Sequence, residues 1–216
     1  MSINLTSFNG KIFGVGFHKT GTSSLHIFLK LLGYHGIHWP DRVKGVHYQK
    51  LCAPQLHDKN QVLEILMPVF SQFETFCDVP IPALYQELDD RFPGSRFILM
   101  ERNAEEWWAS IVKHWHLVEK EKRILDPYEY LQYNYEDTIP LYEITIDNKT
   151  EVLHRYSSHI ERVKDYFKGR PNAFLSVSIH DPDIAERIAA FLQLNEVPKF
   201  PKARRSSVSG PPSTKW

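Results

Sequence analysis

The sequence has no excess charge of either sign. Its 26 lysines and arginines balance 26 aspartates and glutamates over 216 residues. A protein without net charge has no overall field to attract nucleic acid or an acidic membrane surface, so we expect neither as a partner. Any site for an anion must therefore be made by a few cations that the fold brings together locally.

Cysteines and long apolar runs are also scarce. The only two cysteines, Cys52 and Cys77, are in no metal-type spacing, so we predict neither a disulfide framework nor a metal site. No apolar run approaches the roughly 20 residues that span a bilayer. The N-terminus lacks the basic and apolar regions of a signal peptide. We therefore expect a cytoplasmic protein that does not enter a membrane.

Strand and helix patterns alternate along the chain. Short apolar, β-rich runs at residues 11–17, 73–78, 95–102 and 173–179 are each followed, directly or after an intervening segment, by helical spacing. Continuous apolar strands are typical of a parallel sheet that is buried on both faces. The pattern predicts an α/β fold of three layers, α/β/α, with a central, mostly parallel sheet in one domain over residues 1–200.

Three stretches depart from this alternation. Residues 201–216 are basic, with prolines and serines, and are expected to form a C-terminal tail. Residues 34–60 and 113–150 give mixed signals and are expected to form lid or substrate-binding segments. The second of these contains five tyrosines within residues 128–142, Tyr133 among them. Such a group either stacks on a bound substrate or packs as an ordinary loop or helix pair, and the sequence leaves both open.

The stretch GVGFHKTGTSSL, residues 14–25, joins the first predicted strand to the first predicted helix. Glycines at such a junction let backbone N–H groups and a helix N-terminus point at an anion. Lys19 adds a positive charge, and hydroxyl donors come from Thr20, Thr22, Ser23 and Ser24. We predict a P-loop-like site for phosphate or a related tetrahedral anion. The alternative is an ordinary strand-to-helix turn with a hydroxyl cap.

Charged and polar side chains follow each predicted strand. Lys19, Asp78, Arg102 and His180 come just after the four strands in turn. In a parallel α/β sheet, ligands bind beyond the carboxyl ends of the strands. We therefore expect these four residues to meet at one edge of the sheet, although they are far apart in the sequence.

The order of residues in the loop excludes the usual nucleotide-triphosphatase pattern, in which lysine directly follows glycine. Here Lys19 comes two residues before Gly21. Lys-Thr-Gly-Thr at the end of a first strand resembles the 5′-phosphosulfate loop of the sulfotransferase family. The later stretch ILMERNAEEWWAS also resembles this family, because it places Arg102 and Ser110 eight residues apart, after a strand and in the next helix.

The resemblance extends over Lys11 to Ile111 and again over Phe174 to Leu194. DVPIPALYQELDDRF is similar to a single-domain, P-loop-like subgroup of the family, with Val79 in place of an aromatic residue. This resemblance implies transfer of a sulfuryl group from 3′-phosphoadenosine 5′-phosphosulfate (PAPS) to a hydroxyl or amine. The acceptor expected is a small molecule, the product is 3′-phosphoadenosine 5′-phosphate (PAP), and no metal is expected.

The resemblance also implies which residues bind the donor. They are Lys19, Thr20, Gly21, Thr22, Ser23 and Ser24 for the 5′ end, and Arg102 and Ser110 for the 3′-phosphate. Arg204 and Arg205, in the basic tail, are expected to cover the 3′-phosphate, as a late basic loop does in cytosolic relatives.

Catalysis is assigned to three residues. Lys19 would donate to the bridging oxygen, and Asp78, just after the second predicted strand, would accept the proton of the acceptor. The alternative is that Asp78 caps the following helix or pairs with Lys19. His18 either lines the site or packs behind the loop.

The acceptor side is less defined by the sequence. His38 in GIHWP, its neighbour Trp39, and Tyr133 are the residues expected to contact the acceptor. They lie in the two segments where the resemblance fades, which are the segments that would choose the acceptor.

Two other functions remain compatible with the residues. In a small-molecule or nucleotide kinase that uses ATP and Mg²⁺, Asp78 would bind the magnesium ion, but the position of Lys19 argues against it. A non-catalytic nucleotide-binding module on the same fold is the third possibility.

Overall fold

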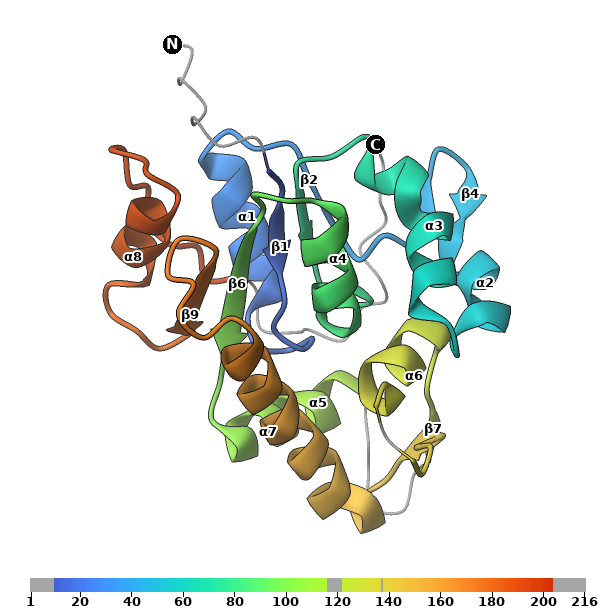
Figure 1. The fold of residues 1–216 in the computed structure, drawn as a ribbon. Helices are drawn as coiled ribbons and strands as arrows, with labels where there is room; N and C mark the ends of the chain where they lie inside the picture. Colours follow the sequence, from blue (N-terminus) through green and yellow to red (C-terminus); the bar gives the residue numbers. More distant parts are fainter. Residues whose placement is uncertain (1–9, 116–121, 137, 204–216) are drawn as a thin grey trace.

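The computed structural model describes residues 10–115, 122–136 and 138–203. Their centre is a five-stranded sheet in the order β2-β5-β1-β6-β9, in which every neighbouring pair is parallel (Figure 1). Its strands are β1 (Ile12–Gly14), β2 (Gly36–His38), β5 (Thr75–Cys77), β6 (Arg96–Glu101) and β9 (Phe174–Ser178). The predicted α/β/α fold with a parallel sheet is confirmed.

Helices connect and cover these strands. They are α1 (Thr22–Leu31), α2 (Tyr48–Cys52), α3 (Lys59–Phe70), α4 (Tyr85–Arg91), α5 (Ala104–Trp115), α6 (Pro127–Asn134), α7 (Lys149–Tyr166) and α8 (Ile184–Phe191), with 3₁₀ turns at Ala53–Gln55, Ile81–Leu84 and Ile146–Asn148. Two small antiparallel hairpins pair β3 (Arg42–Val43) with β4 (Val46–His47) and β7 (Arg123–Ile124) with β8 (Glu143–Ile144).

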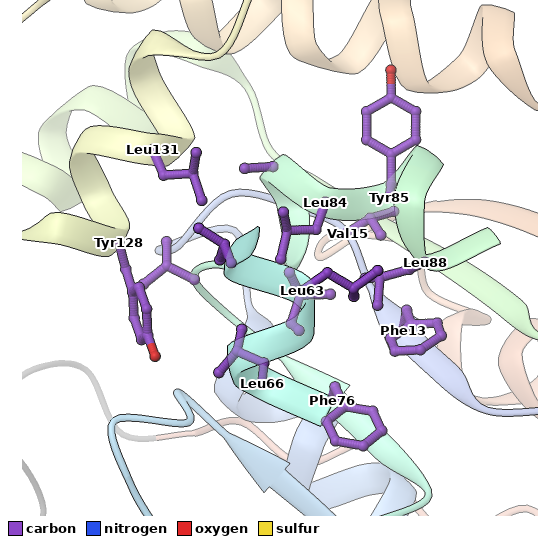
Figure 2. Packing of buried hydrophobic residues seen from close by; sticks show 14 of the residues in the cluster. Phe13, Val15, Leu63, Leu66, Phe76, Leu84, Tyr85, Leu88, Tyr128 and Leu131 are labelled. Carbon is purple, nitrogen blue, oxygen red and sulfur yellow. The ribbon is translucent and has the colours of Figure 1, made fainter. Parts of the chain in front are cut away.

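Each face of the sheet is buried because alternate side chains of its apolar strands point to opposite sides. Phe13 and Phe97 pack on the face covered by α3, α4 and α7, and Figure 2 shows part of this cluster. Ile12 and Ile98, their neighbours in the strands, pack on the other face against α1 and α8. Burial of one such side chain stabilises the fold by about 1.5–3 kcal/mol.

A third cluster lies outside the sheet. It joins α5, α6, α7 and the β7–β8 hairpin, and it includes Phe17 from the loop after β1. The Trp107 and Tyr156 rings stack with their centroids 4.1 Å apart. The described part of segment 113–150 is thus a packed subdomain, and its core fixes the position of the loop that follows β1.

The edge strand β2 was not predicted. It falls in segment 34–60, which we expected to be a lid or substrate-binding segment. A three-residue strand that begins with glycine gives no apolar run to detect. Gly36 is required by close packing, because a Cβ there would lie 2.0 Å from Thr75 Oγ1 on β5. Part of this segment thus extends the sheet and brings His38 to its carboxyl edge, and its predicted role as a lid or substrate-binding segment stays a prediction.

In Figure 1 strand β6 runs down into α5, so the carboxyl ends of the sheet face the region of α5, α6 and β7. The loop after β1, the start of α1 and the residues that follow β2 and β5 lie at this edge. Of the helices in the described ranges, none combines the length and apolar character that a membrane span needs.

Candidate active site

The helix that follows β1 begins without a side-chain cap. Its N-cap residue is Gly21, with φ of 110°, and its first turn contains no acidic residue. A Cβ on Gly21 would lie 2.7 Å from the Ile179 side chain, so glycine is needed both for conformation and for space. The first N–H groups of an α-helix have no partner within the helix. At α1 no side chain caps them, and a helix dipole favours an anion at such a position.

Lys19 lies in the same loop and has a left-handed backbone, with φ of 67°. Burial lowers the pKa of its ammonium group, the charge of Asp78 opposes that shift, and the charge of Arg102 adds to it. The ammonium makes no hydrogen bond or ion pair with any other described residue. The Lys19 ammonium is thus close enough to Asp78 and Arg102 for the charges of both to affect its pKa.

Asp78 follows β5 and also has a left-handed backbone, with φ of 72°. Its Oδ1 accepts the Val79 N–H at 2.9 Å. Its Oδ2 lies 3.1 Å from His38 Nε2 and accepts the Thr22 hydroxyl at 3.5 Å. Left-handed conformations of residues other than glycine are costly and concentrate at functional sites. The strained backbone directs this carboxylate toward the start of α1.

His38 ends β2 and completes this group. Its Nε2 lies 3.2 Å from Thr22 Oγ1 and 3.2 Å from Ser23 Oγ, in addition to its contact with Asp78. Trp39 beside it donates its backbone N–H to Cys77 O at 3.0 Å and packs partly buried against the main core. His38 thus contacts both the first turn of α1 and Asp78. The sequence did not indicate this double contact.

A second group of polar residues follows β6. Arg102 Nε lies 3.4 Å from Glu106 Oε2, one turn along α5, and Ser110 lies one further turn along the same line, half-buried. The backbone of Arg102 is held by the Tyr156 hydroxyl, which accepts from its N–H at 3.0 Å and donates to its carbonyl at 2.7 Å. His180, after β9, is 2.8 Å from the same Glu106 oxygen.

Two of the predicted site residues are packed behind the loop. His18 is 6% exposed, and its ring contacts Gln132 Nε2 at 3.0 Å and the Tyr133 hydroxyl at 3.3 Å. Burial lowers the pKa of His18 to about 3, so the ring stays neutral. Tyr133 is 1% exposed. The structure corrects both assignments, because His18 has both ring nitrogens bonded and Tyr133 offers no face on which an acceptor could stack.

Two hydroxyls of the loop are also engaged within the protein. Thr20 is fully buried, and its hydroxyl donates to Phe17 O at 2.7 Å, so it holds the loop rather than a ligand. Ser24 Oγ accepts the Ala203 N–H at 3.0 Å, which ties the end of the described chain to α1. Arg204 and Arg205 lie outside the described residues. Thr22 and Ser23 remain as the hydroxyls that face His38 and Asp78.

Sequence reasoning missed residues of α7 and α6 that build the site. His159 lies between the Tyr135 hydroxyl, at 2.9 Å from Nδ1, and Val15 O, at 2.8 Å from Nε2, just before the loop. Glu129 on α6 is buried, and burial followed by the charge of Asp126 raises its pKa to about 8, while Arg123 opposes the shift. A histidine on the buried face of an amphipathic helix was the available signal for His159.

Over residues 10–115, 122–136 and 138–203, no group of three histidine, cysteine, aspartate or glutamate side chains is arranged to hold a metal ion.

The structure is that of an α/β protein with an uncapped helix start, a lysine and a carboxylate near the carboxyl edge of a parallel sheet. The family described as "Sulfotransferase domain" matches residues 11–208. Because this match covers most of the 216 residues, the chain belongs to the sulfotransferase domain family. The resemblance stated from the loop and from the Arg102–Ser110 spacing is confirmed at the level of the family.

Other comparisons are more distant. No curated protein has significant sequence similarity to this chain. Among solved structures, the crystal structure of TT1252 from Thermus thermophilus is similar, with a TM-score of 0.44 and 13% identity over 85% of this chain and 96% of that one. A similarity of that size has no bearing on function.

Proposed function

We propose that this protein transfers the sulfuryl group of PAPS to a hydroxyl or amine of a small-molecule acceptor by in-line displacement. Membership of the sulfotransferase domain family supports sulfuryl transfer in general. The observation that carries the proposal is the uncapped start of α1, with Lys19, Thr22 and Asp78 around it. A site that combines free N–H groups, a cation and a carboxylate serves both an anionic donor and an acceptor that must lose a proton.

The 5′-phosphate of the donor is assigned to the start of α1. The N–H groups of Gly21, Thr22 and Ser23 would bind its oxygens, with the hydroxyls of Thr22 and Ser23. No carboxylate in the first turn of α1 competes for these donors. Thr20 is left out of this set because its hydroxyl is already bound to Phe17.

The 3′-phosphate is assigned to Arg102 and Ser110. Both lie on the line that runs from the end of β6 along α5. The Arg102 side chain is partly exposed, and its pairing with Glu106 is a surface ion pair, which is weak enough to exchange for a phosphate. Arg204 and Arg205 are proposed to add positive charge over the same phosphate.

The reaction needs positioning and charge stabilisation more than covalent chemistry by the protein, as in phosphoryl transfer. As the acceptor atom bonds to sulfur, the bond from sulfur to the bridging oxygen breaks and negative charge grows on the leaving phosphate. Lys19 would stabilise that charge by donating to the bridging oxygen. Asp78 would take the proton that the acceptor releases.

The acceptor is proposed to lie on the His38 and Asp78 side of the loop. These residues and Trp39 come from the ends of β2 and β5, next to the start of α1. A small alcohol, phenol or amine matches a site in which one carboxylate, rather than a long basic groove, faces the donor.

Ligand-dependent thermal stability tests the donor. A ligand present at 100 times its Kd raises the free energy of unfolding by about 2.7 kcal/mol. PAP without Mg²⁺ is expected to raise the Tm, and Arg102→Ala is expected to lose most of that increase. Glu105→Ala, on the solvent side of α5, is the matched control and should keep it. An increase with ATP–Mg²⁺ and none with PAP would contradict the proposal.

A further inference from the structure

Strand pairing places His38 and Asp78 side by side. In the parallel pair β2–β5, His38 is in register with Cys77, and the next N–H, from Trp39, donates to Cys77 O at 3.0 Å. The residue after Cys77 is Asp78, so both side chains leave the same edge of the sheet. The result is the 3.1 Å contact between His38 Nε2 and Asp78 Oδ2. The two residues are 40 positions apart in the sequence, and only the short strand β2 brings them together.

The hydrogen bonds around Asp78 determine which atom carries the shared proton. An ionised carboxylate only accepts, so His38 Nε2 must carry the hydrogen and donate to Oδ2. Oδ2 also accepts from the Thr22 hydroxyl, and Oδ1 accepts from the Val79 N–H. A carboxylate has about four lone-pair positions, two on each oxygen. Three are therefore filled by described residues, and the free one is on Oδ1.

We infer that His38 is a positioning residue for proton transfer: its Nε2–H holds Oδ2 of Asp78, so that Oδ1 receives the proton of the acceptor. This inference rests on the proposed function. The O–H proton of the acceptor passes to Oδ1, and the electron pair left on the acceptor oxygen forms the bond to sulfur. The bond from sulfur to the 5′-phosphate oxygen breaks, and its electron pair leaves with PAP.

A charged neighbour makes this positioning necessary. Lys19 is close enough for the charge of Asp78 to affect its pKa, yet the two groups form no ion pair among the described residues. Direct pairing would occupy the base and also neutralise the cation that the leaving phosphate needs. The hydrogen bonds from His38 and Thr22 hold the carboxylate on the side of β2, away from that pairing.

The test compares His38→Gln, which keeps an N–H donor, with His38→Leu, which has a similar size and no donor. Sulfuryl transfer from PAPS is measured with unsubstituted phenol, which keeps its O–H proton at neutral pH, and with water as acceptors. The Kd of PAP is measured separately. Loss of one hydrogen bond to a charged group corresponds to a decrease in rate of about 10- to 100-fold. We expect that loss in kcat for His38→Leu, recovery of most of it in His38→Gln, and a Kd for PAP that stays within about threefold.

The double variant distinguishes positioning from an independent effect. If His38 acts through Asp78, His38→Leu costs little further activity in an Asp78→Asn background. An equal loss in both backgrounds, a wild-type kcat in His38→Leu, or a His38→Gln variant no better than His38→Leu would overturn the inference while leaving the proposed function intact. A wild-type protein that neither binds PAP nor consumes PAPS would overturn the proposed function, and the inference with it.

Discussion

The first turns of α1 and α3 are built in opposite ways. At α3, the Asp58 side chain accepts from the N–H groups of Asn60 and Gln61 at 3.0 and 3.1 Å, which satisfies the helix start within the protein. At α1, Gly21 occupies the same position and offers no side chain. A missing cap alone does not mark an anion site, because α2 and α8 also begin without a side-chain cap. What distinguishes α1 is that a glycine starts it and that Lys19 and Asp78 lie beside it.

The start of α6 agrees with α3. Asp126 and Glu129 form a reciprocal capping box there, with Glu129 buried. α3 and α6 contribute residues to the main core. The first turn of α1 instead lies near Lys19, His38 and Asp78. The comparison predicts that changes at α1 affect ligand binding, and that equivalent changes at α3 and α6 affect stability.

Removal of the loop cation should have the largest effect. Lys19→Ala is expected to lower kcat/KM for PAPS by about 100- to 1,000-fold, since it removes a preorganised donor to the leaving group. Steady-state rates with a fixed acceptor measure this. The control is Lys50→Ala, an exposed lysine on α2. Equal activity of the Lys19 variant and the wild type would show that the loop does not stabilise the leaving phosphate.

An acid placed in the open first turn sharpens the comparison. Ser23 and Asn60 are both the second residue of their helices and are both exposed. Ser23→Asp is expected to weaken PAP binding by about 100-fold or more, because a carboxylate would occupy the N–H groups and repel phosphate. Calorimetric titration with PAP measures the Kd.

Asn60→Asp is the matched control, because it adds the same charge to the first turn of α3. It should bind PAP as the wild type does. If both variants lose affinity equally, net charge rather than the start of α1 governs binding. If neither variant does, the donor is not held at α1.

Loss of the cap at α3 should affect stability alone. Asp58→Ala is expected to lower the free energy of unfolding by about 1 kcal/mol, which in a chain of this size is roughly 2–4 °C in Tm. The Kd of PAP should not change. Differential scanning calorimetry together with the titration tests this, and a large loss of PAP affinity would remove the distinction between the two helices.

The buried glutamate of α6 predicts that the stability of the fold depends on pH. Its pKa is raised from the ordinary 4.5 to about 8 by burial, so the folded chain holds this proton more tightly than the unfolded chain. The contribution of this group to the free energy of unfolding is fully present below about pH 4.5. It is lost as the pH rises toward 8. Glu129→Gln should therefore lose less Tm than the wild type between pH 5 and 8. Parallel Tm–pH curves would contradict the shift.

Much of the fold was predictable because it depends on local patterns. The strands at β1, β5, β6 and β9 are apolar runs, and α7 is amphipathic, so their existence follows from hydrophobic periodicity. The strand β2 has no such signal, because its pairing with β5 depends on a glycine that fits against Thr75. Pro68 lies in the last turn of α3, and the helix continues to Phe70.

The site was predictable where a motif lies on one continuous segment. Lys19 and Asp78 each come shortly after an apolar strand, so their position at the carboxyl edge of the sheet follows from parallel topology. The His38–Asp78 contact depends on the unpredicted strand β2, and the burial of His18 depends on Gln132 and Tyr133, more than 100 positions away. Sequence alone does not show which polar side chains a distant core will cover.

A crystal structure of the complex with PAP tests the central claim most directly. The account predicts the 5′-phosphate on the N–H groups of Gly21, Thr22 and Ser23, with Lys19 against it and the 3′-phosphate on Arg102. A PAP molecule bound elsewhere, with the start of α1 still open, would contradict it.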